Sequence, residues 1–145
     1  MKKFKDLDCV LLVDDDIPTN FIHTKVVKNA KLQVDILAIT SAREALDYLT
    51  FSGKYEADDV GRRPGIIFLD INMPGMSGWD FMEEYGRIDA VLKKRTIVIM
   101  LTTSMNPDDE SLAATNREIV NYLHKPLNED ALMKIAGKYF EEISN

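Results

Sequence analysis

Four short apolar runs of this sequence end in residues that could perform phosphoryl chemistry. Asp14 and Asp15 follow the first run, Asp70 follows a second, Thr102 follows a third, and Lys125 closely follows a fourth. A carboxylate can attack phosphorus and form an aspartyl phosphate, while an ammonium or hydroxyl group can stabilise the phosphoryl oxygens. These residue types therefore predict phosphoryl transfer to an aspartate.

The same residues predict a site for a hard divalent cation. Three carboxylates beside one ammonium leave a net charge of about -2, and two like charges about 4 Å apart repel by roughly 4 kcal/mol at an effective dielectric of 20. Such a cluster needs protons or a cation. Carboxylate oxygens in an open site suit Mg²⁺ or Mn²⁺, whereas the His and Cys ligands of zinc are missing from these positions. The expected metal-binding carboxylates are Asp14, Asp15 and Asp70.

Five short runs rich in Val, Ile and Leu are the strands that must position these residues. They are Cys9–Val13, Val34–Ile39, Ile66–Leu69, Ile97–Leu101 and Val120–Leu123. The carboxyl ends of parallel strands form the ligand-binding edge of an open sheet. The first, third, fourth and fifth strands are therefore expected to bring the candidate residues into one pocket.

Amphipathic segments between these runs predict helices. They begin near Pro18, Ser41, Ser77, Asn106 and Asn128, and most of these residues are good helix caps. The last helix is expected to carry a buried stripe of Leu132, Ile135, Ala136, Tyr139, Phe140 and Ile143. Strand and helix alternate five times, which predicts an α/β, doubly wound fold with a parallel sheet.

Composition narrows the class of protein. The length of 145 residues fits a single domain, 1–145, with a core at about 8–143 and no output domain. A net charge of -6 argues against nucleic acid and anionic membranes as partners. No apolar run approaches the roughly 20 residues of a membrane helix, and residues 1–8 do not resemble a signal peptide. We therefore expect a cytoplasmic protein. The polar stretch 51–64 is expected to be a surface excursion.

Four motifs together carry a family resemblance. They are the apolar run ending in Asp14-Asp15, the segment Phe68–Gly78 (FLDINMPGMSG), the segment Ile99–Thr102 and the pair Lys125-Pro126. In this order and spacing they closely resemble the receiver domain of two-component response regulators. The resemblance spans nearly the whole chain and implies a flavodoxin-like (βα)5 sandwich with strand order 2-1-3-4-5.

The resemblance also implies roles for the metal ligands. Asp15 and Asp70 would bind Mg²⁺ directly, and Asp14 would bind it through water. The backbone carbonyl of Asn72 would complete the protein's share of the coordination.

For phosphoryl transfer, the resemblance implies that Asp70 is the phosphoacceptor and that Thr102 and Lys125 hold the phosphoryl group. The Lys125-Pro126 bond would be cis. Tyr122 would be the switch aromatic, which turns inward when Thr102 moves toward the phosphoryl group, although it could also be a plain surface tyrosine. The signal would then be displayed on the face of the fourth helix, fifth strand and fifth helix.

The implied partners are a sensor histidine kinase or phosphotransfer protein and a separate downstream target. A homodimer through the fourth helix, fifth strand and fifth helix is a further possibility. The protein would not be an enzyme beyond its own Mg²⁺-dependent phosphorylation and dephosphorylation. His23 and His124 are expected to be surface or partly packed residues rather than phosphorelay histidines, and Asp16 a solvated or helix-capping residue.

Three alternatives remain open. A phosphatase of the haloacid-dehalogenase type would use Asp14 as the nucleophile, but Pro18 stands where that family has threonine. A flavodoxin-like nucleotide binder would need a phosphate loop after the first strand, where this chain is acidic. A pseudo-receiver would act by binding alone, without phosphorylation.

Overall fold

Five parallel strands form the central sheet of the computed structural model, which describes residues 1–56 and 63–143. The strands are β2 (Cys9–Val13), β3 (Asp35–Ile39), β4 (Ile66–Leu69), β5 (Ile97–Thr102) and β6 (Ile119–His124). Their order is β3-β2-β4-β5-β6, and all neighbours are parallel. When these five strands alone are numbered, this is the predicted order 2-1-3-4-5. The predicted doubly wound fold is therefore confirmed.

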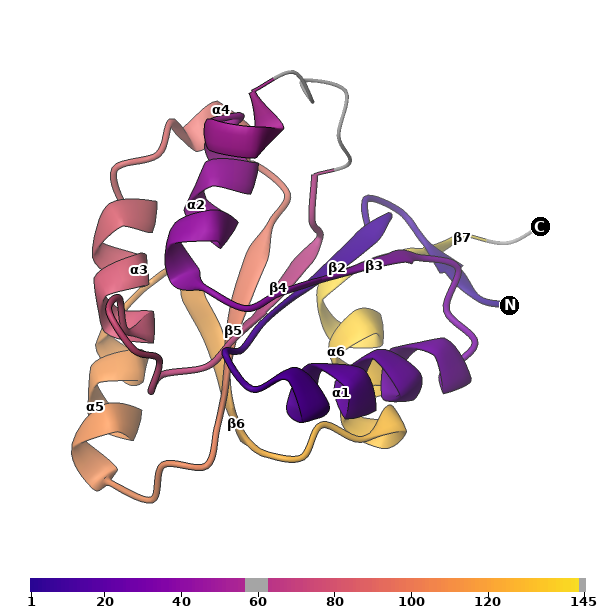
Figure 1. The fold of residues 1–145 in the computed structure, drawn as a ribbon. Coiled ribbons are helices and arrows are strands. Elements are labelled where there is room, and N and C mark those ends of the chain that lie inside the picture. Colours follow the sequence, from indigo (N-terminus) through magenta and orange to yellow (C-terminus); the bar gives the residue numbers. More distant parts are fainter. Residues whose placement is uncertain (57–62, 144–145) are drawn as a thin grey trace.

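Helices cover both faces of this sheet (Figure 1). One face carries α1 (Ile17–Asn29) and α6 (Glu129–Tyr139). The other face carries α2 (Ala42–Thr50), α3 (Gly78–Tyr85) and α5 (Pro107–Thr115). Two short elements, the 3-10 turn η1 (Gly53–Tyr55) and α4 (Ala90–Lys93), were not expected from the sequence.

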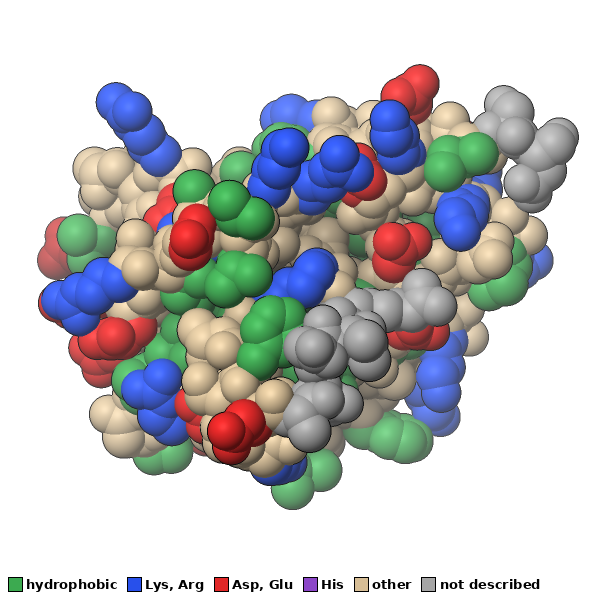
Figure 2. Space-filling view, turned by 90° about the horizontal axis from the view of Figure 1, so that it is seen from above, with side chains coloured by type: hydrophobic (Ala, Val, Ile, Leu, Met, Phe, Trp, Pro, Cys, Tyr) green, Lys and Arg blue, Asp and Glu red, His purple; other side chains and the backbone are tan. Residues whose placement is uncertain are grey.

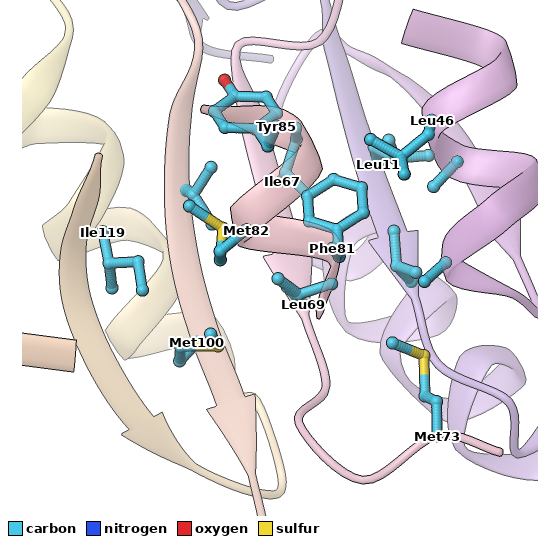
Figure 3. Close-up of a cluster of buried hydrophobic side chains, with 14 of the residues drawn as sticks. Leu11, Leu46, Ile67, Leu69, Met73, Phe81, Met82, Tyr85, Met100 and Ile119 are labelled. Carbon is cyan, nitrogen blue, oxygen red and sulfur yellow. The ribbon is translucent and has the colours of Figure 1, made fainter. Parts of the chain in front are cut away.

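Because helices cover both faces of the sheet, the central strands are apolar along their whole length. Every residue of β2 and β4 is buried. Figure 3 shows the core on the α2 and α3 side, where Phe81 and Tyr85 lie against the sheet and their rings stack with centroids 5.6 Å apart. A second core lies under α1 and α6, around Phe68 and Leu132. These two cores hold the strand ends, and hence the candidate site, in fixed positions.

The predicted extension of the last helix to Ile143 is wrong. α6 ends at Tyr139, and Phe140 takes an extended conformation with φ -132° and ψ 152°. The chain then forms β7 (Glu142–Ile143), which pairs antiparallel with the N-terminal strand β1 (Lys3–Phe4). This pairing satisfies backbone groups that a longer helix would have bonded internally, and it leaves Ile143 39% exposed.

One face of the molecule carries side chains of mixed character (Figure 2). The face seen from above carries lysine and arginine side chains among acidic and apolar ones (Figure 2). Within the described ranges, no helix is long and apolar enough to cross a membrane. Of the predicted excursion 51–64, residues 57–62 lie outside the described residues.

Candidate functional site

Asp14 and Asp15 stand where β2 ends and the chain turns into α1. Asp14 is 5% exposed, and its Oδ1 accepts a hydrogen bond of 2.9 Å from the backbone N–H of Asp16. The amide of Asn20 donates to the Asp14 carbonyl over 2.8 Å, a contact that the sequence did not suggest. Asp16 caps α1 by accepting from Thr19, as predicted, whereas the exposed Asp15 projects from the same turn.

Asp70 follows β4, and its position depends on a close approach of two backbone segments. Its carboxylate Oδ1 accepts from the backbone N–H of Ile71 over 2.9 Å, and the residue is 6% exposed. The N–H of Gly78 donates to the Ile71 carbonyl over 2.8 Å. A Cβ atom on Gly78 would lie 2.9 Å from the Cα of Ile71 and even closer to the Asp70 carbonyl. Only glycine fits here, so this residue of the FLDINMPGMSG segment positions Asp70.

The structure brings the three predicted carboxylates together with the predicted lysine. Asp14, Asp15 and Asp70 each place a carboxylate oxygen within 4.8 Å of the others. Nζ of Lys125 lies 2.5 Å from Oδ2 of Asp14 and 3.3 Å from Oδ1 of Asp70. Three acidic groups and one ammonium group thus share the cluster, which leaves it with the predicted excess of negative charge.

This arrangement shifts the pKa values of Asp70 and Lys125. Burial raises the pKa of Asp70, and the negative charge of Asp14 adds to this, while Lys125 opposes it. Burial alone would lower the pKa of Lys125, but its contacts with Asp14 and Asp70 outweigh burial and raise it. Lys125 is therefore held in its charged form. A cation bound beside the buried Asp70 would favour the ionised form of its carboxylate.

Thr102 is the last residue of β5 and is fully buried. Its carbonyl accepts from the backbone N–H of Lys125 over 2.9 Å, which fixes the two residues side by side. The Thr102 hydroxyl accepts from the backbone N–H of Ser104 over 3.1 Å, so its proton is available for an acceptor in the site.

The predicted cis bond between Lys125 and Pro126 is present. The backbone N–H of Leu127 donates to Nε2 of His23 over 3.3 Å. His23 is 2% exposed, so its predicted surface or partly packed position is wrong, whereas His124 is exposed as predicted. His23 shares the buried face of α1 with Asn20 and Val27. Their spacing of three and four residues is the signal that could have revealed this.

Tyr122 lies on β6, and Asn72 lies in the loop after β4. Tyr122 is half-buried against the core that lies on the α2 and α3 side of the sheet. Its ring lies edge-on to His124. Its buried hydroxyl makes no hydrogen bond of normal geometry with the described residues. Burial raises the pKa of Tyr122 and outweighs the opposing effect of the nearby Ser104 side chain. Asn72 lies exposed in the loop after β4, two residues beyond Asp70.

Comparison with known proteins agrees with this geometry. A family model described as the response regulator receiver domain matches residues 10–136. The response regulator Rcp1 of Synechocystis sp. is 29% identical over 126 residues, which cover 87% of this chain and 82% of Rcp1. The chain spans about half the length of two further curated relatives.

Solved structures give the same result. A two-component response regulator from Cytophaga hutchinsonii is 33% identical, with a TM-score of 0.80 over 92% of this chain and 96% of that one. The phosphorylated cyanobacterial phytochrome response regulator RcpA is 26% identical, with a TM-score of 0.71 over 91% and 90%. The Mn²⁺-bound form of response regulator Rcp1 is 28% identical, with a TM-score of 0.70 over 90% of both chains. The chain therefore belongs to the receiver domain family of two-component response regulators.

Proposed function

We propose that this receiver domain takes a phosphoryl group on Asp70 in a step that requires Mg²⁺ or Mn²⁺. The observation that carries the proposal is the convergence of Asp14, Asp15 and Asp70 within 4.8 Å, with Lys125 in contact with two of them. The phosphorylated RcpA and the Mn²⁺-bound Rcp1 support both parts of it by similarity.

The donor set fits a hard divalent cation. Its side-chain atoms are carboxylate oxygens. Asp14 and Asp70 are buried, whereas Asp15 is exposed. The Asn72 carbonyl is the fourth proposed ligand, and its exposed loop leaves room for water ligands, which Mg²⁺ usually retains. When bound, the cation would neutralise charge that builds up on the phosphoryl oxygens.

The protein's own side chains would carry out the remaining parts of the phosphoryl transfer. The contacts found for the Asp70 carboxylate use Oδ1, which leaves Oδ2 as the proposed attacking oxygen. A bond forms between that oxygen and phosphorus while the bond from phosphorus to the donor breaks. Lys125 and the Thr102 hydroxyl would then bind the phosphoryl oxygens, and Tyr122 would respond to the movement of Thr102 as the switch residue.

The proposed donor is a sensor histidine kinase or a phosphotransfer protein, and the proposed receiver of the signal is a separate target protein. A homodimer through the face of α5, β6 and α6 is compatible with this role. These elements are the fourth helix, fifth strand and fifth helix of the (βα)5 pattern. We propose no turnover beyond the domain's own phosphorylation and dephosphorylation. Family membership supports a cytoplasmic location as part of this proposal.

Intact-mass spectrometry tests the proposal directly. The protein is incubated with Mg²⁺ and acetyl phosphate, alongside Asp70→Asn and the control variant Asp130→Asn, whose carboxylate is exposed on α6. We expect one phosphoryl adduct in the wild type and the control, none in Asp70→Asn, and none when Mg²⁺ is chelated. An adduct that persists in Asp70→Asn would instead favour Asp14 and the phosphatase alternative.

A further inference from the structure

A chain of hydrogen bonds leads from the candidate site to α3. The backbone N–H of Ser104 donates to the Thr102 hydroxyl over 3.1 Å, and the Ser104 hydroxyl donates to Oδ2 of Asp109 over 2.6 Å. The other carboxylate oxygen of Asp109, Oδ1, accepts from the indole N–H of Trp79 over 3.1 Å. Asp109 thus bridges the loop that follows Thr102 and the first turn of α3.

This bridge attaches an otherwise exposed loop to the rest of the molecule. Thr103 is exposed, and Met105 is 81% exposed. Inside the loop, the Ser104 hydroxyl also accepts from the backbone N–H of Asn106 over 3.2 Å. Ser104 is therefore the residue that ties this loop to α5, through the hydrogen bond from its hydroxyl to Asp109. Hydrogen bonds to a carboxylate are stronger than neutral ones, so this attachment is well suited to fix the loop.

Trp79, at the other end of the bridge, packs against the hydrophobic core. It is half-buried beside the core on the α2 and α3 side of the sheet, and it lies 30 residues before Asp109 in the sequence. A shift of Ser104 that keeps its hydrogen bond to Asp109 pulls the Asp109 carboxylate away from the indole or carries α5 with it. In both cases the surroundings of Trp79 change.

We propose that Asp109 is a positioning residue that couples the loop after Thr102 to Trp79 on α3. When Thr102 turns toward a phosphoryl group on Asp70, its hydroxyl ceases to hold the Ser104 N–H in place, and the change passes through Asp109 to the indole. The coupling extends the proposed function, on which it rests, to a face of the molecule between α3 and α5. Coupling of this kind is reciprocal, so a change at Trp79 also alters the loop.

Fluorescence tests the coupling because Trp79 is the sole tryptophan of the chain. Emission is recorded before and after phosphorylation with Mg²⁺ and acetyl phosphate, at equal adduct levels measured by intact mass. We expect a change in the wild type and in the control Asp108→Ala, which alters the exposed neighbour. In Asp109→Ala the change should be at least about fivefold smaller. An equal change in Asp109→Ala, or none in a phosphorylated wild type, would overturn the coupling.

Hydrogen exchange tests the same link without phosphate, so failure of the coupling can be told apart from failure of phosphorylation. Trp79→Phe keeps an aromatic ring in place but removes the donor to Asp109. Exchange at the amides of Ser104 and Asn106 should become at least about fivefold faster in this variant. Unchanged exchange at both amides would show that Trp79 and the loop are not coupled, whatever the outcome of the phosphorylation experiment.

Discussion

At the residue scale, the charge balance of the site depends on Lys125. Its Nζ contacts both Asp14 and Asp70, and all three side chains are largely buried. Removing the ammonium would leave two neighbouring carboxylates without compensation, and the pKa of Asp70, already raised by burial, would rise further.

We therefore expect Lys125→Met to lower the free energy of unfolding by about 2–4 kcal/mol in the absence of divalent cations. Added Mg²⁺ should recover part of this loss, because a cation that binds the folded state stabilises it. Urea titrations with and without Mg²⁺ measure both effects, with the exposed Lys134→Met as the control. A loss that Mg²⁺ leaves unchanged would argue against a cation site beside Lys125.

His23 gives the molecule a predictable response to acid. Burial and the positive charge of Lys125 lower its pKa from 6.5, and its Nε2 must be unprotonated to accept from Leu127. The unfolded chain therefore binds more protons than the folded one below about pH 6.5. The stability that the neutral His23 contributes is therefore present above about pH 6.5. It is lost as the pH falls through the lowered pKa of His23 in the folded state.

His23→Gln keeps a neutral acceptor at this position and removes the titration. Between about pH 7.5 and 5.5, the free energy of unfolding should fall less in this variant than in the wild type. The exposed His124→Gln should behave like the wild type. Parallel urea titrations measure this difference. An identical pH dependence in the wild type and His23→Gln would show that His23 is not a source of the acid sensitivity.

At the scale of elements, the turn from β4 into α3 determines where Asp70 lies. The N–H of Gly78 bonds to the carbonyl of Ile71, and there is no space for a side chain at this contact. Ser77 and Asp80 form a reciprocal capping box that fixes the start of α3 at the same place.

Gly78→Ala is expected to cost about 2–3 kcal/mol of stability, since the new methyl group must displace the backbone of residues 70 and 71. Gly137→Ala is the matched control, because a Cβ atom at this helical position meets nothing within 4 Å. Removing glycine from a helix interior should stabilise by about 0.5–1 kcal/mol. Thermal unfolding of both variants measures the contrast, and similar shifts for the two would contradict the close approach at Gly78.

The elements also show what a sequence can reveal. β2 and β4 were predicted with their observed bounds, because strands covered on both faces are unbroken apolar runs. The helix caps at Ser41, Ser77 and Asn106 were predicted because capping is a local interaction. The four-residue α4 carries no periodic signal of its own and was missed.

At the scale of the whole molecule, the two ends of the chain illustrate what local patterns miss. Ile143 continues the helical spacing of Ile135 and Tyr139, so the sequence favoured a longer helix. The competing partner, β1, lies some 140 residues away in sequence, and only the folded chain brings the two together. The bridge from Ser104 through Asp109 to Trp79 was missed for the same reason, because it depends on how α5 packs against α3.

The site itself could be predicted because its residues stand at strand ends, and a parallel sheet gathers those ends at one edge. Asp14, Asp15, Asp70 and Lys125 meet there as the sequence indicated. The contacts that hold them, such as the amide of Asn20 on the Asp14 carbonyl, arise from helix packing and could not be predicted.

The most direct test of the account is to locate the phosphoryl group chemically. Borohydride reduces an aspartyl phosphate to homoserine, so reduction after treatment with Mg²⁺ and acetyl phosphate, followed by peptide mass mapping, identifies the modified aspartate. We predict homoserine at position 70, in the peptide that contains the FLDINMPGMSG segment. Homoserine at position 14, with Asp70 unmodified, would contradict the assignment of Asp70 as the phosphoacceptor.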